Sequence, residues 1–238
     1  IFPTSTPLLS PAQHLLFQYK AHQHASNDGT KPLGVKRIVV FRNGGADGSF
    51  PEILSNEITE GIREAVAEDS ACGADGPCRD SNCFECRPPV TCVVSQKDHS
   101  VRIVPDMGAQ RGKPVNVDSG TVVDDPKIMM FENGLKLATS ASEAGDNGFD
   151  FFLTAQAGLK GTSKPVLYRV LENENYTRTP PGGTSLTRDI LEQMCYHMSF
   201  QYGTATKSTR LLPILKYAER AATHARNYFD HLAYTKLN

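Results

Sequence analysis

A short apolar run, a glycine-rich break, an amphipathic segment and a second apolar run follow one another in the first half of the chain. The run at residues 37–41 is typical of a strand covered on both faces. Three glycines within residues 44–48 interrupt it, and apolar residues near helical spacing then predict a helix over about residues 50–67. The next buried strand is expected at residues 90–94. A strand, a helix and a strand in this order imply a right-handed crossover and a parallel pair. The polar turn after the first strand then lies at the edge where open α/β sheets bind ligands.

The rest of the chain extends this α/β pattern. Further strands are predicted at residues 101–104, 121–123, 149–153 and 166–171, and further helices at about residues 11–22, 186–202 and 213–232. Two segments have the composition of insertions: a Cys-, Gly- and Pro-rich one at residues 70–89 and a polar one at residues 129–148. A chain of 238 residues can bury a full core, so one domain is the default.

Charge and cysteine content limit the classes of partner. The net charge is −1, so any nucleic-acid site must come from a local arrangement of Lys and Arg. No apolar run approaches the ~20 residues that a membrane helix needs, so no membrane partner is expected. Four of the six cysteines are clustered, which fits a reducing compartment, cytoplasmic or nuclear, better than a disulfide scaffold. In such a compartment the glycosylation sequon Asn175-Tyr176-Thr177 has no meaning.

Five blocks of residues carry a resemblance to a known family. They are residues 41–50, residues 94–99 with Arg102, residues 120–124, residues 149–153 with residues 157–165, and residues 213–226. In order and spacing they resemble the Piwi domain of eukaryotic Argonautes, over nearly the whole chain. The resemblance implies an RNase H-like α/β fold, a mixed sheet flanked by helices. It also implies that residues 1–238 are the C-terminal portion of a Piwi domain and that the first strands of the fold lie upstream of Ile1.

The resemblance also bears on catalysis. Active Piwi domains resemble RNase H in using carboxylates to hold two divalent metal ions, and Mg²⁺ requires anionic oxygen ligands. Asn43 stands where the family has its second catalytic Asp, and Glu219 stands where the family has its last ligand, a His or Asp. An Asn offers only a neutral carbonyl oxygen. The resemblance therefore implies a member that does not cleave RNA, for which no cofactor is expected.

Guide-RNA binding is implied by the same resemblance and rests on phosphate contacts. The loop at residues 158–164 offers backbone N–H groups, two hydroxyls and two ammonium groups, which suit phosphate oxygens. Asp98 stands where the family has Arg, and His224 stands where the family has an Arg that reaches the guide 5′ phosphate. The contacts with the guide RNA are therefore expected to differ from those usual in the family. The candidate RNA-binding residues are Lys97, Arg102, Lys160, Thr162, Ser163, Lys164, Lys207, Lys216, Arg220, His224 and Arg226.

The cysteine cluster forms a separate candidate site. Cys72, Cys78, Cys83 and Cys86 have the spacing C-x5-C-x4-C-x2-C, and four thiolates can hold Zn²⁺. Two of the spacings are wider than usual, so free thiols on a loop are the alternative. The remaining two cysteines, Cys92 and Cys195, lie in apolar runs and are predicted to be core residues.

Three functions remain open on these grounds. The first is a guide-RNA-binding module that also engages a complementary target RNA and silencing-complex proteins, without target cleavage. The second is a divergent RNA endonuclease that uses Glu219, acids upstream of Ile1 and Mg²⁺. The third is a protein-docking pseudo-Piwi domain that has lost RNA, which the net charge and Asp98 keep open.

Overall fold

The computed structural model describes residues 35–69, 83–84, 87–105, 116–125, 148–158 and 161–236, and the side chains of these residues except 68–69 and 229–236. The helix predicted at residues 11–22 and most of the insertions at residues 70–89 and 129–148 lie outside these ranges.

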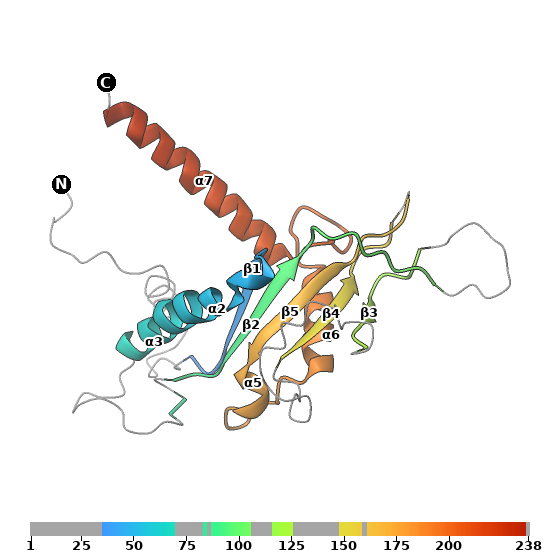
Figure 1. Ribbon diagram of the computed structural model, residues 1–238, viewed down its shortest axis with the longest axis horizontal. Helices are drawn as coiled ribbons and strands as arrows, with labels where there is room; N and C mark the ends of the chain where they lie inside the picture. Colours follow the sequence, from blue (N-terminus) through green and yellow to red (C-terminus); the bar gives the residue numbers. More distant parts are fainter. Residues whose placement is uncertain are drawn as a thin grey trace, which may run out of the picture. The chain divides into compact units, whose positions relative to one another are not determined.

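A five-stranded mixed sheet organises the described residues, in the order β1-β2-β5-β4-β3 (Figure 1). Backbone hydrogen bonds from Ile38 N to Pro89 O and from Gly44 N to Ser95 O advance in the same direction along both chains, so β1 and β2 are parallel as predicted. The pairs β4/β5 and β3/β4 are antiparallel. The strands are β1 (Ile38–Asn43), β2 (Val90–Gln96), β3 (Thr121–Val123), β4 (Phe149–Thr154) and β5 (Val166–Asn173).

The helix predicted between the first two strands is present, but its centre is wound more loosely than an α-helix. It runs through η1 (Asp47–Ser49), α2 (Phe50–Glu52), the π-helical η2 (Ile53–Arg63) and α3 (Glu64–Asp69). The Thr59 hydroxyl donates to Leu54 O at 3.0 Å, five residues earlier, which matches the π-helical repeat. Phe50, Ile53 and Ile58 are buried on one side of this helix.

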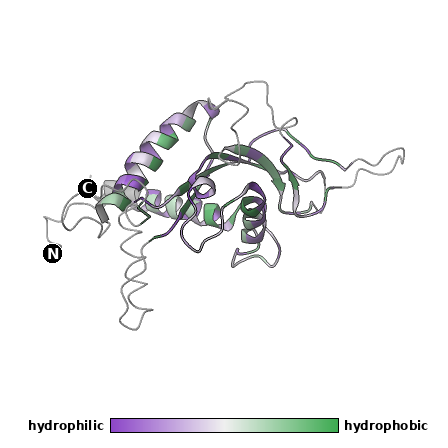
Figure 2. Ribbon diagram, turned by 90° about the horizontal axis from the view of Figure 1, so that it is seen from below, coloured by the Kyte–Doolittle hydropathy of each residue, from purple (hydrophilic) through white to green (hydrophobic). Residues whose placement is uncertain are grey.

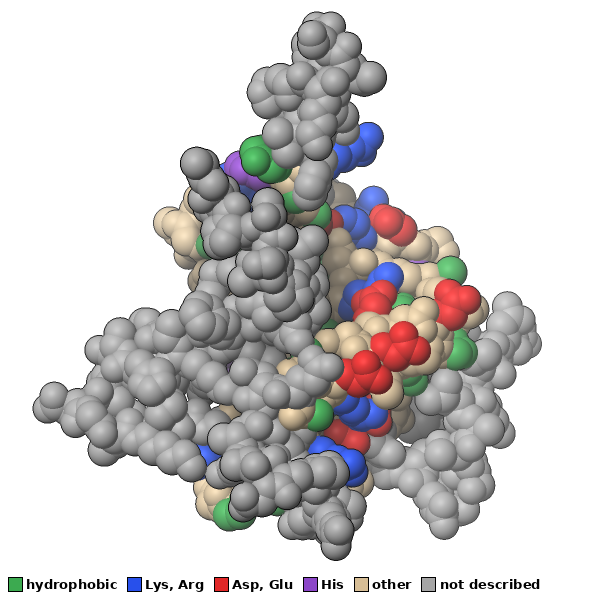
Figure 3. Space-filling model, turned by 90° about the vertical axis from the view of Figure 1, so that its left-hand side faces the viewer, with side chains coloured by type: hydrophobic (Ala, Val, Ile, Leu, Met, Phe, Trp, Pro, Cys, Tyr) green, Lys and Arg blue, Asp and Glu red, His purple; other side chains and the backbone are tan. Residues whose placement is uncertain are grey.

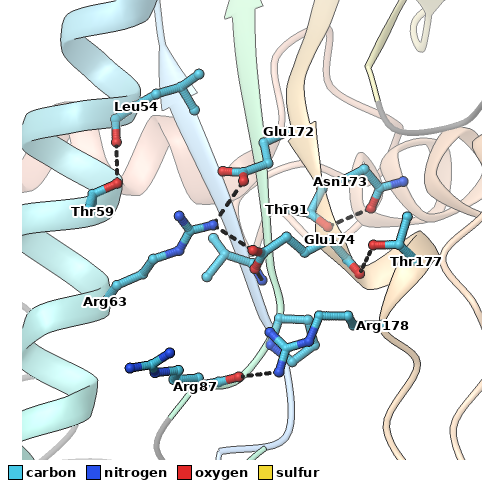
Figure 4. A network of polar contacts seen from close by, with 12 residues as sticks. Leu54, Thr59, Arg63, Arg87, Thr91, Glu172, Asn173, Glu174, Thr177 and Arg178 are labelled. Carbon is cyan, nitrogen blue, oxygen red and sulfur yellow. Dashed lines mark hydrogen bonds and ion pairs between the residues drawn. The ribbon is translucent and has the colours of Figure 1, made fainter. Parts of the chain in front are cut away.

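The chain divides into two compact units. The first contains the long helix, the start of β2 and the segment at residues 171–185. In it Arg63 donates to Glu172 and forms ion pairs with Glu172 and Glu174, each at 2.9 Å (Figure 4). Burial alone would lower the pKa of Arg63, but the two carboxylates raise the pKa above its ordinary value.

Asn175 is a buried polar residue at the centre of a hydrogen-bond network in the first unit. Its side chain is fully buried, and its Nδ2 lies within hydrogen-bonding distance of Ile38 O (3.0 Å), Pro89 O (3.2 Å) and Thr91 Oγ1 (2.9 Å). This single amide joins the backbones that lead into β1 and β2. The sequon asparagine is therefore a core residue with no surface for a glycan.

The second unit holds most of the apolar core. Phe151 and Tyr168 are paired across β4 and β5, both are fully buried, and their rings stack with centroids 5.1 Å apart. Helix α6 (Arg188–Met198) packs against β4 and buries Leu191 and Cys195. Helix α7 (Pro213–Lys236) buries Leu215 and extends away from the end of β2, with hydrophilic and hydrophobic residues mixed along its length (Figures 1 and 2).

Two sequence predictions about buried residues have different outcomes in this fold. Cys92 and Cys195 are fully buried, as predicted for core residues, and burial raises the pKa of the Cys195 thiol. The strand predicted at residues 101–104 is wrong, because this segment has no strand pairing. Val101 and Ile103 still pack against Phe152 and Leu167, so the alternating pattern reflects one-sided packing of an extended segment.

No helix in the part of the chain that the structure describes has the length and apolar character to cross a membrane.

Candidate nucleic-acid interface

The C-terminal ends of β1 and β2 lie side by side and bring Asn43 close to Ser95 and Lys97. A glycine turn follows β1: Gly44 and Gly45 have φ values of +72° and +145°, which residues other than glycine rarely adopt. Gln96 Nε2 donates to Gly45 O at 2.7 Å and holds this turn against β2. The polar turn that was predicted at this edge of the sheet is thus present, and the hydrogen bond from Gln96 holds it in place.

Asn43 and Glu219, the two positions that the resemblance links to catalysis, are in direct contact. Asn43 Nδ2 donates to Glu219 Oε1 at 2.5 Å, and Lys97 Nζ forms an ion pair with the same oxygen at 2.9 Å. Ser95 Oγ lies 3.4 Å from Asn43 Oδ1. Asn43, Lys97 and Glu219 together form an amide–ammonium cluster, which unites residues from β1, from the end of β2 and from α7.

The electrostatics of this cluster follow from its contacts. The hydrogen bond from Lys97 lowers the pKa of Glu219, the hydrogen bond from Asn43 and the charges of Lys97 and Lys216 lower it further, and burial opposes them. Glu219 is therefore an anion at neutral pH, and its charge is compensated by the Lys97 ammonium group.

We expect a carboxyl titration to show this pairing. By NMR, Glu219 should titrate below its ordinary pKa of 4.5, and Lys97→Met should move the value back toward 4.5. Lys216→Met is the matched control and should have a smaller effect, because Lys216 acts only through its charge. Because the folded-state pKa is lowered, any stabilisation from the pair is present above pH 4.5 and is lost as the pH falls through the folded-state value. An unchanged titration in Lys97→Met would contradict the pairing.

The donor set of the cluster does not fit the Mg²⁺ sites of RNase H-like enzymes. Of three side chains, one is a neutral amide, one is a cation and only one is a carboxylate. Glu219 Oε1 already accepts from both neighbours. Within the described ranges, no three His, Cys, Asp or Glu side chains are grouped closely enough to hold a metal ion.

The loop at residues 158–164 is held from inside by Asn116. Asn116 Nδ2 donates to Gly158 O at 3.1 Å and to Gly161 O at 2.8 Å, while Ser163 N donates to Asn116 Oδ1 at 2.7 Å. A Cβ on Gly158 would lie 3.0 Å from both Asn116 Nδ2 and Ser163 Oγ, so this close approach needs glycine. Sequence reasoning missed Asn116, whose only signal was an amide residue shortly before a strand.

The predicted phosphate ligands of this loop have different environments. Thr162 and Lys164 are exposed and available to a ligand. Ser163 is buried, and its hydroxyl accepts from Gly158 N at 2.9 Å, so this hydroxyl already has a partner within the loop. Lys160 lies outside the described residues.

The other candidate RNA-binding residues are spread over the second unit. Arg102 Nη1 donates to the carbonyl oxygens of Val101 and His99, so this guanidinium folds back on its own segment. Lys216, on α7, lies with Nζ 4.5 Å from the ring centroid of Tyr202. Exposed residues elsewhere are Lys207 in the α6–α7 connection and Arg220, His224 and Arg226 on α7. The spacing of four residues places Lys216, Arg220 and His224 on one face of this helix.

Acidic side chains lie among the basic ones at the surface. On the face drawn in Figure 3, the Lys and Arg side chains of the described residues are interspersed with Asp and Glu side chains. This mixture agrees with the net charge of −1. Any attraction of a nucleic acid would therefore have to come from small groups of cations, and the predicted groups lie at the end of β2 and in the loop at residues 158–164.

Of the cysteine cluster, only Cys83 is described, and it is partly exposed; Cys72, Cys78 and Cys86 lie outside the described residues. The zinc site stays a prediction.

Comparison with known proteins gives the family. A family model described as "Piwi domain" matches residues 5–230. The chain belongs to the Piwi domain family. Curated relatives of this Piwi domain include protein argonaute 11 of Oryza sativa subsp. japonica, 31% identical over 82% of the chain, and protein argonaute 5 of Arabidopsis thaliana, 32% identical over 82%. The chain spans only 18% and 16% of their lengths.

Solved structures agree with this membership and with the RNase H-like fold. The C-terminal lobe of a budding yeast Argonaute superposes with a TM-score of 0.62 at 26% identity, covering 96% of this Piwi domain and 39% of that chain. Kluyveromyces polysporus Argonaute, solved with a guide RNA, gives the same TM-score and identity and is covered to 23%. Membership of the Argonaute/Piwi family, predicted from the five sequence blocks, is confirmed.

Proposed function

We propose that this Piwi domain helps an Argonaute-type protein hold a small guide RNA for silencing, without cleaving the target. The observation that carries the proposal is the amide–ammonium cluster. Its Lys97 ammonium group neutralises the one carboxylate present, and Asn43 cannot supply a second. A two-metal mechanism requires several anionic ligands around closely spaced cations.

The RNA-binding half of the proposal is supported by three features. The family consists of RNA-guided silencing proteins, and a structurally similar Argonaute was solved with a guide RNA. The loop at residues 158–164 is ordered by Asn116 and presents Thr162 and Lys164 outward. Phosphate recognition needs donors and positive charge but no base identity, which such a loop supplies. A complementary target RNA and silencing-complex proteins are the partners that this function implies.

The non-cleaving half is tested with the full-length protein loaded with a defined guide. A perfectly complementary target RNA, incubated with Mg²⁺, is expected to remain intact opposite the guide, while a cleaving Argonaute serves as the positive control. Guide-directed cleavage by the wild-type protein that disappears in Glu219→Gln would overturn the proposal. Such a result would support the endonuclease alternative, in which Glu219 is a metal ligand.

The guide-binding half is tested by sequencing small RNAs that co-purify with the full-length protein. One enriched class with a narrow length distribution is the expected result. The absence of any enriched class would contradict guide binding and would favour the protein-docking alternative.

A further inference from the structure

Lys97 and Lys164, two of the residues predicted to contact phosphate, both accept a hydrogen bond at their backbone oxygen from the guanidinium of Arg210, which was not among the predicted site residues. Arg210 Nε donates to Lys164 O at 3.0 Å, and Arg210 Nη2 donates to Lys97 O at 2.9 Å. The same Nη2 lies 3.4 Å from Pro165 O. Arg210 therefore joins the end of β2 to the end of the loop at residues 158–164, although 113 and 46 residues separate it from these two segments.

The backbone on either side of Arg210 is fixed. Thr209 is buried, its N–H donates to Ser199 O at 2.9 Å, and its hydroxyl lies 2.8 Å from Leu211 O. Leu211 and Leu212 are buried next to it. The guanidinium is thus presented from a rigid base, which is what a positioning contact requires.

The chemistry of the contact suits arginine in particular. A guanidinium offers several N–H donors in a planar fork, whereas an ammonium group is a single compact donor centre. The hydrogen-bond acceptors of Arg210 in the described residues are carbonyl oxygens. Asp98 acts on Arg210 through its charge, while the guanidinium itself donates to the backbone of the two segments that carry Lys97 and Lys164.

We propose that Arg210 is a positioning residue for the guide-RNA backbone. It fixes the spacing between Lys97 and Lys164 so that both ammonium groups meet phosphates of one strand, and its own charge adds to the attraction. The ligand class is the phosphodiester backbone of a single strand, read without base contacts. This inference rests on the proposed function and adds to it the element that sets the geometry of the phosphate site.

The test compares Arg210→Lys and Arg210→Met in the full-length protein. Lys keeps the charge but cannot bridge both segments, and Met removes charge and donors while keeping a long side chain. Binding of a 5′-phosphorylated single-stranded RNA is measured by fluorescence anisotropy over a range of salt concentrations. Amide hydrogen exchange of residues 161–164 reports the order of the loop.

We expect both variants to bind RNA about tenfold more weakly, because hydrogen bonds from a charged donor are lost in each. Amide hydrogen exchange in residues 161–164 should become faster in both. The salt slope should fall only in Arg210→Met, by about 0.7, the value for one phosphate contact of a single strand. Asn116→Ala, which loosens the same loop from its other side, should weaken binding without changing the slope.

Two outcomes would overturn the inference. If Arg210→Lys binds like the wild type while Arg210→Met does not, only charge matters and the positioning role is wrong. If both variants bind RNA and exchange like the wild type, Arg210 has neither role. A wild-type protein that fails to bind RNA defeats the proposed function itself, which distinguishes that failure from the other two. Thermal unfolding of each variant reports any global loss of structure.

Discussion

Replacing Lys97 and Lys164 together with methionine is expected to weaken guide-RNA binding by roughly 25-fold at 0.1 M salt. The estimate follows from counterion release, because two lost phosphate contacts on a single strand lower the salt slope by about 1.4. The difference from the wild type should therefore shrink as the salt concentration approaches about 1 M. Methionine keeps the apolar stems of both side chains, so the change removes mainly charge.

The two single variants should not contribute equally. Lys97→Met also leaves the Glu219 carboxylate without its ammonium partner, 2.9 Å away in the wild type, and this anion would then repel a phosphate. We expect Lys97→Met to cost more affinity than Lys164→Met, and Glu219→Gln in the Lys97→Met background to recover part of the loss.

The measurement is anisotropy of labelled single-stranded RNA with the full-length protein. Lys36→Met is the matched control, since Lys36 is exposed and lies outside the candidate interface. Affinity unchanged in the double variant, or an equal loss in Lys36→Met, would show that the two lysines are not specific phosphate contacts.

The largest effect on stability is expected for Asn175→Ala. The alanine removes an amide whose Nδ2 lies within hydrogen-bonding distance of Ile38 O, Pro89 O and Thr91 Oγ1, and the removed side chain has no solvent exposure. Pro89 O still accepts from Ile38 N, and Thr91 Oγ1 still donates to Asn173 Oδ1. The loss therefore comes from the broken buried hydrogen bonds and from the void that the amide leaves, and about 3 kcal/mol is expected.

A loss of this size should lower the melting temperature of the domain by roughly 6–12 °C, measured by differential scanning fluorimetry. Asn56→Ala is the matched control, because Asn56 is an exposed helix residue whose side-chain oxygen accepts from the neighbouring Ser55, and it should change little. Equal melting temperatures for the two variants would show that the Asn175 amide contributes nothing to stability.

The elements with strong local patterns could be predicted from the sequence. Strands β1 and β2 were predicted from continuous apolar runs, and the helix between them from apolar residues near helical spacing. Buried strands and amphipathic helices leave such patterns in the sequence. The failure at residues 101–104 has a physical cause. Val101 and Ile103 alternate as in a strand, but whether a backbone forms a ladder depends on an available partner strand, which local sequence does not encode.

The candidate site was predicted less completely than the fold. Asn43 and Glu219 were identified by family resemblance, and the structure places them in contact. That Lys97 would pair with Glu219 could not be foreseen, because 122 residues separate them and their meeting depends on where α7 starts relative to β2. Arg210 and Asn116 were missed for a related reason: their acceptors are backbone carbonyls, which every residue has and no sequence motif marks.

The burial of Asn175 has a practical consequence for producing this protein. Oligosaccharyltransferase in the secretory pathway modifies sequons on chains that have not yet folded, and Asn175-Tyr176-Thr177 is such a sequon. A glycan attached there could not be accommodated where the amide contacts Ile38 O and Thr91 Oγ1. Bacterial or cytosolic expression avoids this modification and is therefore the expected route to folded protein.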